Sequence, residues 1–133
     1  MLAEIRIDAM RESLENLGRF DRERSMERFR ASFSPESTEI VRVGDEVAGF
    51  YALTDRGDHL LLNHLYVKPR YQSKGIGATV MARILEQSKA SCLPVKVGAL
   101  KGSRSNDFYR RHGFQRFSEG EWDLYYERPV PSP

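Results

Sequence analysis

The segment LYVKPRYQSKGIGATVMARIL, residues 65–85, contains the clearest structural pattern in the chain. An apolar run ends at Pro69, two glycines follow, and apolar residues then recur at every fourth position. The run is typical of a strand, whereas the recurring positions predict an amphipathic helix that continues to about Ala90. Residues 72–77 are therefore expected to form a turn that leads from a strand into a helix.

This turn has the chemistry of an anion-binding site. Backbone N–H groups at the start of a helix have no partner within the helix, and the helix dipole favours a negative charge beside them. Gly75 and Gly77 carry no Cβ, so a phosphate can approach their backbone, and Lys74 and Arg70 add positive charge. The glycine spacing matches neither the phosphate loop of nucleoside triphosphatases nor the dinucleotide fingerprint. From these residues alone, a pyrophosphate site and a plain tight corner remain equally open.

The rest of the chain changes from a helical period to a two-residue period and back. Asp21 is a suitable helix cap, Pro35 a helix stop, and Gly113 a residue that ends a helix. A strand–helix–strand crossover around the turn requires its two strands to run parallel. Helices are expected at 4–17, between Asp21 and Pro35, at 76–90 and at 103–112, with strands at 38–43, 46–54, 59–67, 93–100, 114–118 and 122–127. The stripes expected to face the core are Ile5, Ala9, Leu14 and Leu17 in the first helix, which Gly18 ends, and Met26, Phe29, Arg30 and Phe33 in the second.

Composition limits the function classes. A length of 133 residues predicts a single domain. The 21 basic and 19 acidic residues nearly balance, which gives no support for nucleic-acid binding. Cys92 is the only cysteine, which excludes an internal disulfide and a cysteine-built metal site, and the 3 histidines lack ligand spacing. Neither a signal peptide nor a membrane-length apolar run is visible, so we expect a cytoplasmic protein without metal, membrane or nucleic-acid partners, and a homodimer is left open.

Two motifs together resemble a known family. VKPRYQSKGIGATVMARIL, residues 67–85, is similar to the acetyl-coenzyme A motif of the GNAT superfamily of N-acetyltransferases, whose consensus Q/R-x-x-G-x-G/A follows a strand. SRSNDFYRRHGF, residues 103–114, is similar to the helix and strand start that come later in that superfamily. The resemblance covers residues 37–127 by motif and the first 35 residues by architecture only.

The resemblance implies an α+β (mixed α/β) GNAT-like fold. Its central mixed sheet would have about six mostly antiparallel strands flanked by four helices, with a splayed parallel strand pair that binds coenzyme A. Residues 1–35 would form a helical acceptor-side region, residues 37–127 the sheet and acetyl-CoA-binding core, and residues 128–133 a tail. The implied activity is transfer of the acetyl group from acetyl-CoA to a primary amine of a small molecule or protein, by direct attack in a ternary complex.

The resemblance also implies how the coenzyme is held. In this family the backbone amides of the turn bind the coenzyme A pyrophosphate. The preceding strand pairs with the pantetheine arm through main-chain groups, and an N–H there can polarise the thioester carbonyl. The pyrophosphate is thereby assigned to Gln72, Ser73, Lys74, Gly75, Ile76, Gly77 and Ala78, and the pantetheine arm to Leu65, Tyr66 and Val67.

Two residues of the second motif carry family roles. Tyr109 matches the tyrosine that gives a proton or a hydrogen bond to the departing thiolate, which suits a neutral phenol. The alternative is an amphipathic tyrosine whose ring belongs to the core. Asn106 matches an asparagine that part of the family uses on the pantetheine arm, although the more widespread pattern has an asparagine where this chain has Gly102.

The general base departs most from the family pattern. Many relatives carry a glutamate where this chain has Asn63, which cannot take a proton but can orient a water that relays it. We therefore expect either a water relay or an amine that arrives partly deprotonated. Strand alternation places His64 on the opposite face, where a surface or partly buried histidine is expected. His59 is expected to be structural and Cys92 inert.

The acceptor is expected to lie against the first two helices, their connecting loop and the last strands. Candidate contacts are Arg19, Phe20, Arg22, Trp122 and Tyr125, although a charge run in a helix is usually a solvated face. The family normally begins with a strand, which EIRI, residues 4–7, would either supply or leave missing.

Two other functions compete with catalysis. A non-catalytic acyl-CoA-binding or sensing module would keep the turn and lose turnover, consistent with the absent glutamate and the displaced asparagine. An RNA-associated protein would use the basic segment 68–74, but the near-balanced charge and the lack of interleaved exposed aromatics count against it.

Overall fold

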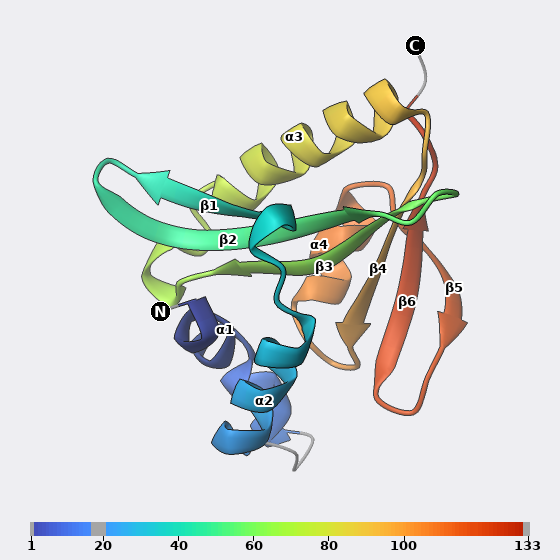
Figure 1. Ribbon diagram of the computed structural model, residues 1–133. Coiled ribbons are helices and arrows are strands. Elements are labelled where there is room, and N and C mark those ends of the chain that lie inside the picture. The colour runs from blue at the N-terminus through green and yellow to red at the C-terminus, as the bar shows by residue number, and fades with distance from the viewer. Residues whose placement is uncertain (1, 17–20, 132–133) are drawn as a thin grey trace. The chain divides into compact units, whose positions relative to one another are not determined.

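The computed structural model describes residues 2–16 and 21–131 (Figure 1). The α-helices in these ranges are α1 (Leu2–Asn16), α2 (Arg22–Ser32), α3 (Ile76–Ser91) and α4 (Ser105–Arg111). The strands are β1 (Thr38–Val43), β2 (Glu46–Asp55), β3 (Leu60–Val67), β4 (Val95–Leu100), β5 (Gln115–Glu119) and β6 (Asp123–Arg128). Short 3-10 turns occupy Pro35–Ser37 and Pro69–Tyr71. The predicted element order is confirmed, with ends that differ by one or two residues at most positions.

The strands form one six-stranded sheet in the order β1-β2-β3-β4-β6-β5. β1 pairs with β2, β4 with β6, and β5 with β6, and each of these pairs is antiparallel. β3 and β4 are parallel, with Leu60 opposite Val95 and Leu62 opposite Val97. The predicted α+β class, with a mostly antiparallel sheet and one parallel pair, is therefore confirmed.

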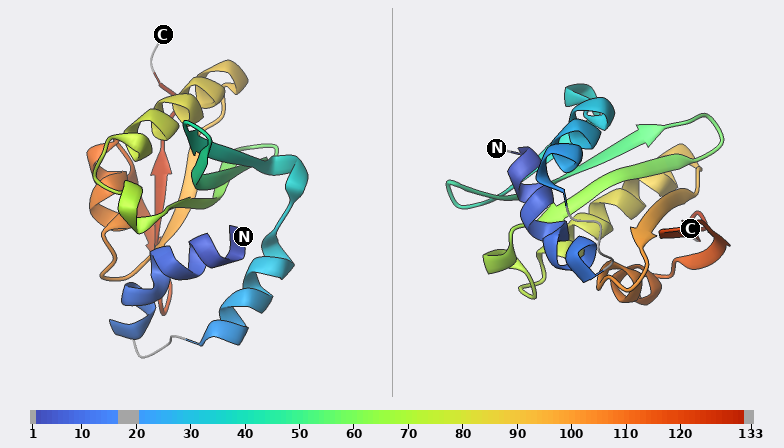
Figure 2. Two further views of the ribbon diagram at one scale, coloured as in Figure 1. Left: turned by 90° about the vertical axis from the view of Figure 1, so that its left-hand side faces the viewer. Right: turned by 90° about the horizontal axis from the view of Figure 1, so that it is seen from below.

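The chain divides into two compact units. One contains Met1–Ala52 and His64–Gly77, and the other contains Leu53–Asn63 and Ala78–Pro133. In the first unit, α1 and α2 lie side by side (Figure 2). Its core is a cluster of buried apolar residues from both helices and from β2, namely Ala3, Ile5, Phe29 and Phe50.

Helix α1 differs from its predicted pattern. Residues 4–7 are helical, so EIRI does not supply a first strand. Ile5 is buried as predicted, but Ala3 and Ile7 are buried with it, and Ala9 is only half-buried. Three apolar residues in the first two turns therefore set the buried face. Leu17 and Gly18, the predicted end of the helix, lie outside the described residues.

Helix α2 begins where the sequence predicts. The Asp21 side chain accepts a hydrogen bond from the Arg24 backbone N–H at 3.1 Å, which satisfies one of the donors that every helix start leaves unpaired. Phe29 is buried in the core, whereas Arg30 is exposed. The predicted stripe was therefore wrong at Arg30, whose charge stays in water.

The second unit is organised around β4 and its antiparallel neighbour β6. Val95, Val97 and Ala99 alternate into the core, and Tyr126 of β6 is fully buried. Helix α3 buries Val80, Met81 and Ile84, which confirms its predicted apolar repeat, together with the polar Ser88. Gly113 ends α4 in the left-handed region at φ +87°, as predicted.

Candidate functional site

The turn between β3 and α3 has an unusual backbone. Ser73 has φ 63° and Gly75 has φ 82°, so two residues of this short turn are left-handed. A left-handed residue other than glycine is uncommon, and such conformations cluster at ligand-binding positions. Left-handed residues can also gather successive N–H groups into a concavity that binds anions. The predicted turn therefore has a geometry suited to an anion.

The turn leads directly into α3. This helix has 16 residues, so its dipole is substantial, and its first amides, those of Ile76 and Gly77, have no carbonyl partner inside the helix. A Cβ built on Gly75 would meet nothing within 4 Å, which leaves open space beside the backbone. Lys74 is exposed at the same place. These features fit a phosphate group held by main-chain N–H groups.

Hydrogen bonds inside the first unit brace the turn. The Gln72 side chain donates from Nε2 to the Val67 carbonyl oxygen at 2.9 Å and closes a loop around Pro69–Tyr71. The Tyr71 backbone N–H donates to the Lys68 carbonyl at 2.8 Å. Sequence reasoning assigned Gln72 only a backbone role, and its side chain additionally holds the end of β3.

Arg70 contributes less free positive charge than the sequence suggested. Its guanidinium pairs with the Glu46 carboxylate and lies 4.9 Å from the centre of the Tyr71 ring. The Tyr71 hydroxyl donates to the same carboxylate. The Tyr71 hydrogen bond, followed by the charge of Arg70, lowers the pKa of Glu46, and the Glu46 carboxylate raises the pKa of Tyr71. At neutral pH the cluster therefore holds an ionised glutamate and a neutral tyrosine.

The second half of β3 separates two faces as alternation predicts. His64 is buried in the first unit, with the rings of Phe29, Phe50 and Tyr66 at 5.7, 5.8 and 5.7 Å. The expectation of a surface or partly buried histidine was wrong, because α2 and β2 supply aromatic side chains that cover this face. His59 lies in the second unit and forms a 2.6 Å hydrogen bond with Asp58, which lowers the pKa of that carboxyl.

Asn63 presents an acceptor without a partner. Its Oδ1 is buried, and within the described residues no donor lies at hydrogen-bonding distance. A buried carbonyl oxygen of this kind usually has a hydrogen bond from protein or water. Asn63 is therefore suited to orient a small polar group, although an amide cannot remove a proton.

Asn106 is buried near the start of α4 and links several parts of the second unit. Its Nδ2 donates to the Leu100 carbonyl at 2.8 Å and to the Ser103 carbonyl at 3.0 Å. Its Oδ1 accepts a hydrogen bond of 2.7 Å from the Tyr126 hydroxyl. The amide thus ties the end of β4 and the loop before α4 to the middle of β6. Sequence reasoning missed Tyr126, because a tyrosine in an alternating strand gives no sign of a partner twenty residues away.

Tyr109 is anchored through its ring. The side chain is 5% exposed, and its ring centre lies 5.3 Å from that of Phe114 and 6.2 Å from that of Tyr126. The ring therefore lies in the core, as in the alternative interpretation, and its burial does not test the predicted role of the hydroxyl in catalysis. This packing fixes the ring direction, and so it limits where the hydroxyl can lie.

The predicted acceptor residues do not form one described cluster. Arg19 and Phe20 lie outside the described residues. In the first unit, Arg22 donates to Glu4 at 2.6 Å between two exposed side chains, as expected for a solvated helix face. In the second unit, Trp122 is half-buried, and the Tyr125 ring lies where Cβ atoms on Gly98 and Gly120 would contact it.

The part of the chain that the structure describes contains neither a cluster of metal ligands nor a helix of membrane-spanning character. Over residues 2–16 and 21–131, no three His, Cys, Asp or Glu side chains come together in a way that could hold a metal ion. Every described helix is too short or too polar to cross a lipid bilayer.

A family profile for the acetyltransferase (GNAT) domain matches residues 35–116, which is more than half of the chain and includes the turn, Asn106 and Tyr109. The chain belongs to the GNAT acetyltransferase family.

Known relatives agree with this assignment. A thialysine N-epsilon-acetyltransferase from Bos taurus is 30% identical over 81 residues, which are 59% of this chain and 48% of that protein, so the chain spans about half the length of this curated relative. The fold is similar to that of PaiA N-acetyltransferase from Thermoplasma acidophilum in complex with coenzyme A, with TM-score 0.79, 19% identity, and coverage of 96% of this chain and 90% of that one. A GNAT family acetyltransferase from Elizabethkingia anophelis with acetyl-CoA bound gives TM-score 0.61 and 16% identity, over 71% of this GNAT chain and 78% of that one.

The Asn106–Tyr126 hydrogen bond can be tested by stability. Tyr126→Phe leaves the ring in place but strands the buried Asn106 Oδ1, so it should lower the free energy of unfolding by about 1–3 kcal/mol in urea denaturation. Tyr125→Phe is the matched control. Tyr125 is the neighbour of Tyr126 in β6 and is 39% exposed, so loss of its hydroxyl should change stability far less. Equal effects of the two substitutions would show that the hydrogen bond does not stabilise this unit.

Proposed function

We propose that this GNAT domain is an acetyl-CoA-dependent N-acetyltransferase that acts on a primary amine. The observation that supports this most directly is the left-handed turn at Ser73 and Gly75, which opens into the N-terminus of α3. The open space beside Gly75 and the exposed Lys74 fit the pyrophosphate of a coenzyme A molecule. The backbone amides of residues 72–78 would bind it.

The pantetheine arm would bind to the backbone of β3. Parallel pairing with β4 involves residues 60–62, and β3 continues beyond them to Val67. We propose that the main chain of Leu65, Tyr66 and Val67 pairs with the amides of the arm as an added strand would. A backbone N–H of this segment would polarise the thioester carbonyl, where negative charge develops during amine attack.

Two side chains would then assist the transfer. The acceptor nitrogen attacks the thioester carbon, the carbon–sulfur bond breaks, and Tyr109 gives its phenolic proton to the departing thiolate. The proton that the amine loses passes to a water, which the unpartnered Oδ1 of Asn63 would orient, and solvent returns a proton to the Tyr109 phenolate. No covalent intermediate on the enzyme is needed.

The role of Asn106 on the coenzyme is narrower than its motif implies. Both Nδ2 hydrogens have acceptors within the second unit, so they do not donate to a ligand without breaking those bonds. Its Oδ1 accepts from Tyr126 and keeps a second lone pair. The proposed contact is therefore acceptance by Oδ1 of a pantetheine N–H.

The acceptor is proposed to be a primary aliphatic amine. The curated relative is named for acetylation of the ε-nitrogen of thialysine, a side-chain amine, but this chain spans about half of that relative. Lysine-like amino acids are therefore the first acceptors to test, followed by other small amines and by peptide amines. The solved structures under 25% identical support the fold and do not select among these.

The coenzyme site has a matched pair of variants. Gly77→Glu places bulk and negative charge in the first turn of α3 and should abolish coenzyme A binding in isothermal titration calorimetry. Gly77→Ala follows the family consensus and should bind nearly as the wild type does.

Acetyl-CoA at a hundredfold excess over its Kd should stabilise the wild type by about 2.7 kcal/mol, which raises Tm. A wild-type protein whose Tm does not respond to acetyl-CoA would contradict the proposed function.

Tyr109→Phe separates chemistry from binding. The substitution removes one hydroxyl and keeps the packed ring, so coenzyme A affinity should change little. If the phenol protonates the thiolate, kcat should fall by roughly 100-fold or more, in the range expected for general acid catalysis. Steady-state kinetics measure this, and an unchanged kcat would remove Tyr109 from the mechanism.

The acceptor can be identified by release of free coenzyme A. Thiol release from acetyl-CoA should rise well above the hydrolysis rate with at least one amine of a panel that begins with lysine-like side-chain amines. Mass spectrometry of the product should show one added acetyl group on that nitrogen. Tight coenzyme binding without release for any amine would instead favour an acyl-CoA-sensing module.

A further inference from the structure

The first residues of β2 contact the chain that leads into the coenzyme turn. Residues 46–49 face residues 66–71, and both segments belong to the first unit. Three different kinds of contact follow one another along this short stretch: a steric one, a backbone hydrogen bond and a cluster of polar side chains. None of the residues on β2 would touch the coenzyme in the proposed function.

The steric contact is at Gly49, a buried residue. A Cβ built there would lie 2.1 Å from the Tyr66 carbonyl oxygen and 3.0 Å from the Val67 Cα. Real Cβ atoms do not approach backbone atoms this closely, and a backbone cannot swing aside as a long side chain can. Glycine therefore lets β2 approach the Tyr66–Val67 peptide more closely than any other residue would permit.

The backbone contact follows one residue earlier on β2. The Lys68 N–H donates to the Ala48 carbonyl at 2.7 Å, just beyond the end of β3. This hydrogen bond continues the contact between the two segments one residue beyond Val67, the last residue of β3. It fixes the chain immediately before Pro69–Tyr71.

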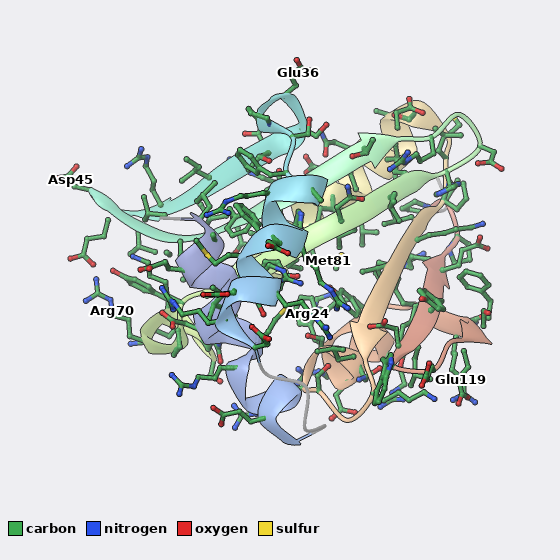
Figure 3. All side chains as sticks on the ribbon, turned by 60° about the horizontal axis from the view of Figure 1, so that its bottom comes forward. Arg24, Glu36, Asp45, Arg70, Met81 and Glu119 are labelled. Atoms are coloured by element: carbon green, nitrogen blue, oxygen red, sulfur yellow. The ribbon has the colours of Figure 1, made fainter. Side chains whose placement is uncertain are left out.

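The side-chain contact is at Glu46. Its carboxylate accepts hydrogen bonds from Arg70 and from the Tyr71 hydroxyl, and the Arg70 guanidinium lies over the Tyr71 ring. Figure 3 shows Arg70 at the same end of this unit as Asp45, the neighbour of Glu46 in the hairpin turn. The Arg70 and Glu46 side chains are 62% and 58% exposed, so the cluster adds little to a buried core.

We propose that residues 46–49 of β2 are a positioning element for the coenzyme, with Glu46 and Gly49 as its key residues. Gly49 sets the position of the Tyr66–Val67 backbone, and Glu46 holds Arg70 and Tyr71 so that the turn at 72–77 is formed before the coenzyme arrives. The inference rests on the proposed function, because it concerns the same coenzyme. A ligand binds more weakly when its binding-competent conformation is only partly populated, so loss of this element weakens binding without removing a ligand contact.

The direction in which Kd changes when the Glu46 charge is removed distinguishes positioning by Glu46 from direct phosphate binding by Arg70. Glu46 is an anion that pairs with Arg70, and Arg70 lies two positions before Gln72, where the proposed pyrophosphate turn begins. If Arg70 bound phosphate directly, removal of the Glu46 charge would free the guanidinium and tighten coenzyme binding. If Glu46 positions the turn, the same removal weakens binding. The two accounts therefore predict opposite changes in Kd.

The test uses Glu46→Gln, Tyr71→Phe and the double variant, with coenzyme A as the ligand in calorimetry. Each single substitution should weaken binding about fivefold, as expected if the competent turn is populated about one fifth of the time. The double variant should weaken binding by less than the product of the two single effects, because both substitutions disrupt the same Glu46–Arg70–Tyr71 cluster. Glu39→Gln on β1 is the matched control, an exposed glutamate of the same unit that should leave Kd unchanged. Tm should stay close to that of the wild type throughout.

A shortened acetyl donor distinguishes the role of Glu46 from that of Gly49. S-acetylpantetheine lacks the pyrophosphate, so Glu46→Gln should raise KM for acetyl-CoA and leave KM for S-acetylpantetheine unchanged. Gly49→Ala displaces the Tyr66–Val67 backbone and should raise KM for both donors. Gly98→Ala is its control, because a Cβ there meets only the Tyr125 side chain, at 3.1 Å. If Gly49→Ala fails to fold, the exposed Glu46 and Tyr71 variants still give the decisive comparison.

Three outcomes would overturn the inference. Equal or tighter coenzyme A binding by Glu46→Gln, with a wild type that binds normally, would refute positioning by Glu46 and leave the proposed function intact. A rise in KM for S-acetylpantetheine as large as that for acetyl-CoA would show a general loss of structure. A wild-type protein that does not bind coenzyme A would remove the proposed function and this inference together.

Discussion

The left-handed backbone at Ser73 and Gly75 is the constraint on which the site depends. It turns the chain from the end of β3 into the start of α3 within a few residues, so the first amides of that helix, which have no partner within it, follow the turn directly. Glycine adopts this conformation freely, whereas Ser73 does so at a cost of about 1–2 kcal/mol. The Gln72–Val67 hydrogen bond and the 3-10 turn before it offset this cost. The strain is therefore located where main-chain donors are proposed to meet a phosphate.

Main chain and side chains have different tasks in both units. The proposed ligand contacts of the first unit are backbone groups, and the side chains of Gln72 and Glu46 hold that backbone. In the second unit Asn106 and Tyr126 form a buried link that holds the start of α4. Exposed ion pairs contribute little to stability, whereas buried hydrogen bonds are costly to break. Changes at Glu46 should thus affect geometry more than stability, and changes at Tyr126 the reverse.

The features that the sequence predicted correctly depend on local patterns of residues. The glycine pattern predicted the strand-to-helix turn at residues 72–77, Asp21 and Gly113 marked helix ends, and strand alternation placed Asn63 and His64 on opposite faces. These features depend on residues within a few positions of each other. The family motifs then supplied the fold, because they fix the order and direction of the elements around the turn.

Long-range contacts account for what the sequence did not predict. Alternation gives the face of His64 but not the phenylalanines of other elements that bury it. The Glu46–Tyr71 contact joins residues 25 positions apart, and nothing in the motif that contains Tyr71 indicates Glu46 as its partner. Arg30 was placed in a stripe by its spacing alone, although its charge keeps it in solvent.

The proposed chemistry of Asn63 has a consequence for the acceptor. An amide in place of a carboxylate can orient a water but cannot lower the energy of proton removal by binding the proton itself. The amine must then lose its proton to solvent, directly or through that water. A lysine-like amine with a pKa near 10.4 is neutral in roughly one molecule in a thousand or fewer at pH 7. Such a domain would gain most from an acceptor site that disfavours the ammonium form, because burial of a charge without a partner shifts the amine toward its reactive state.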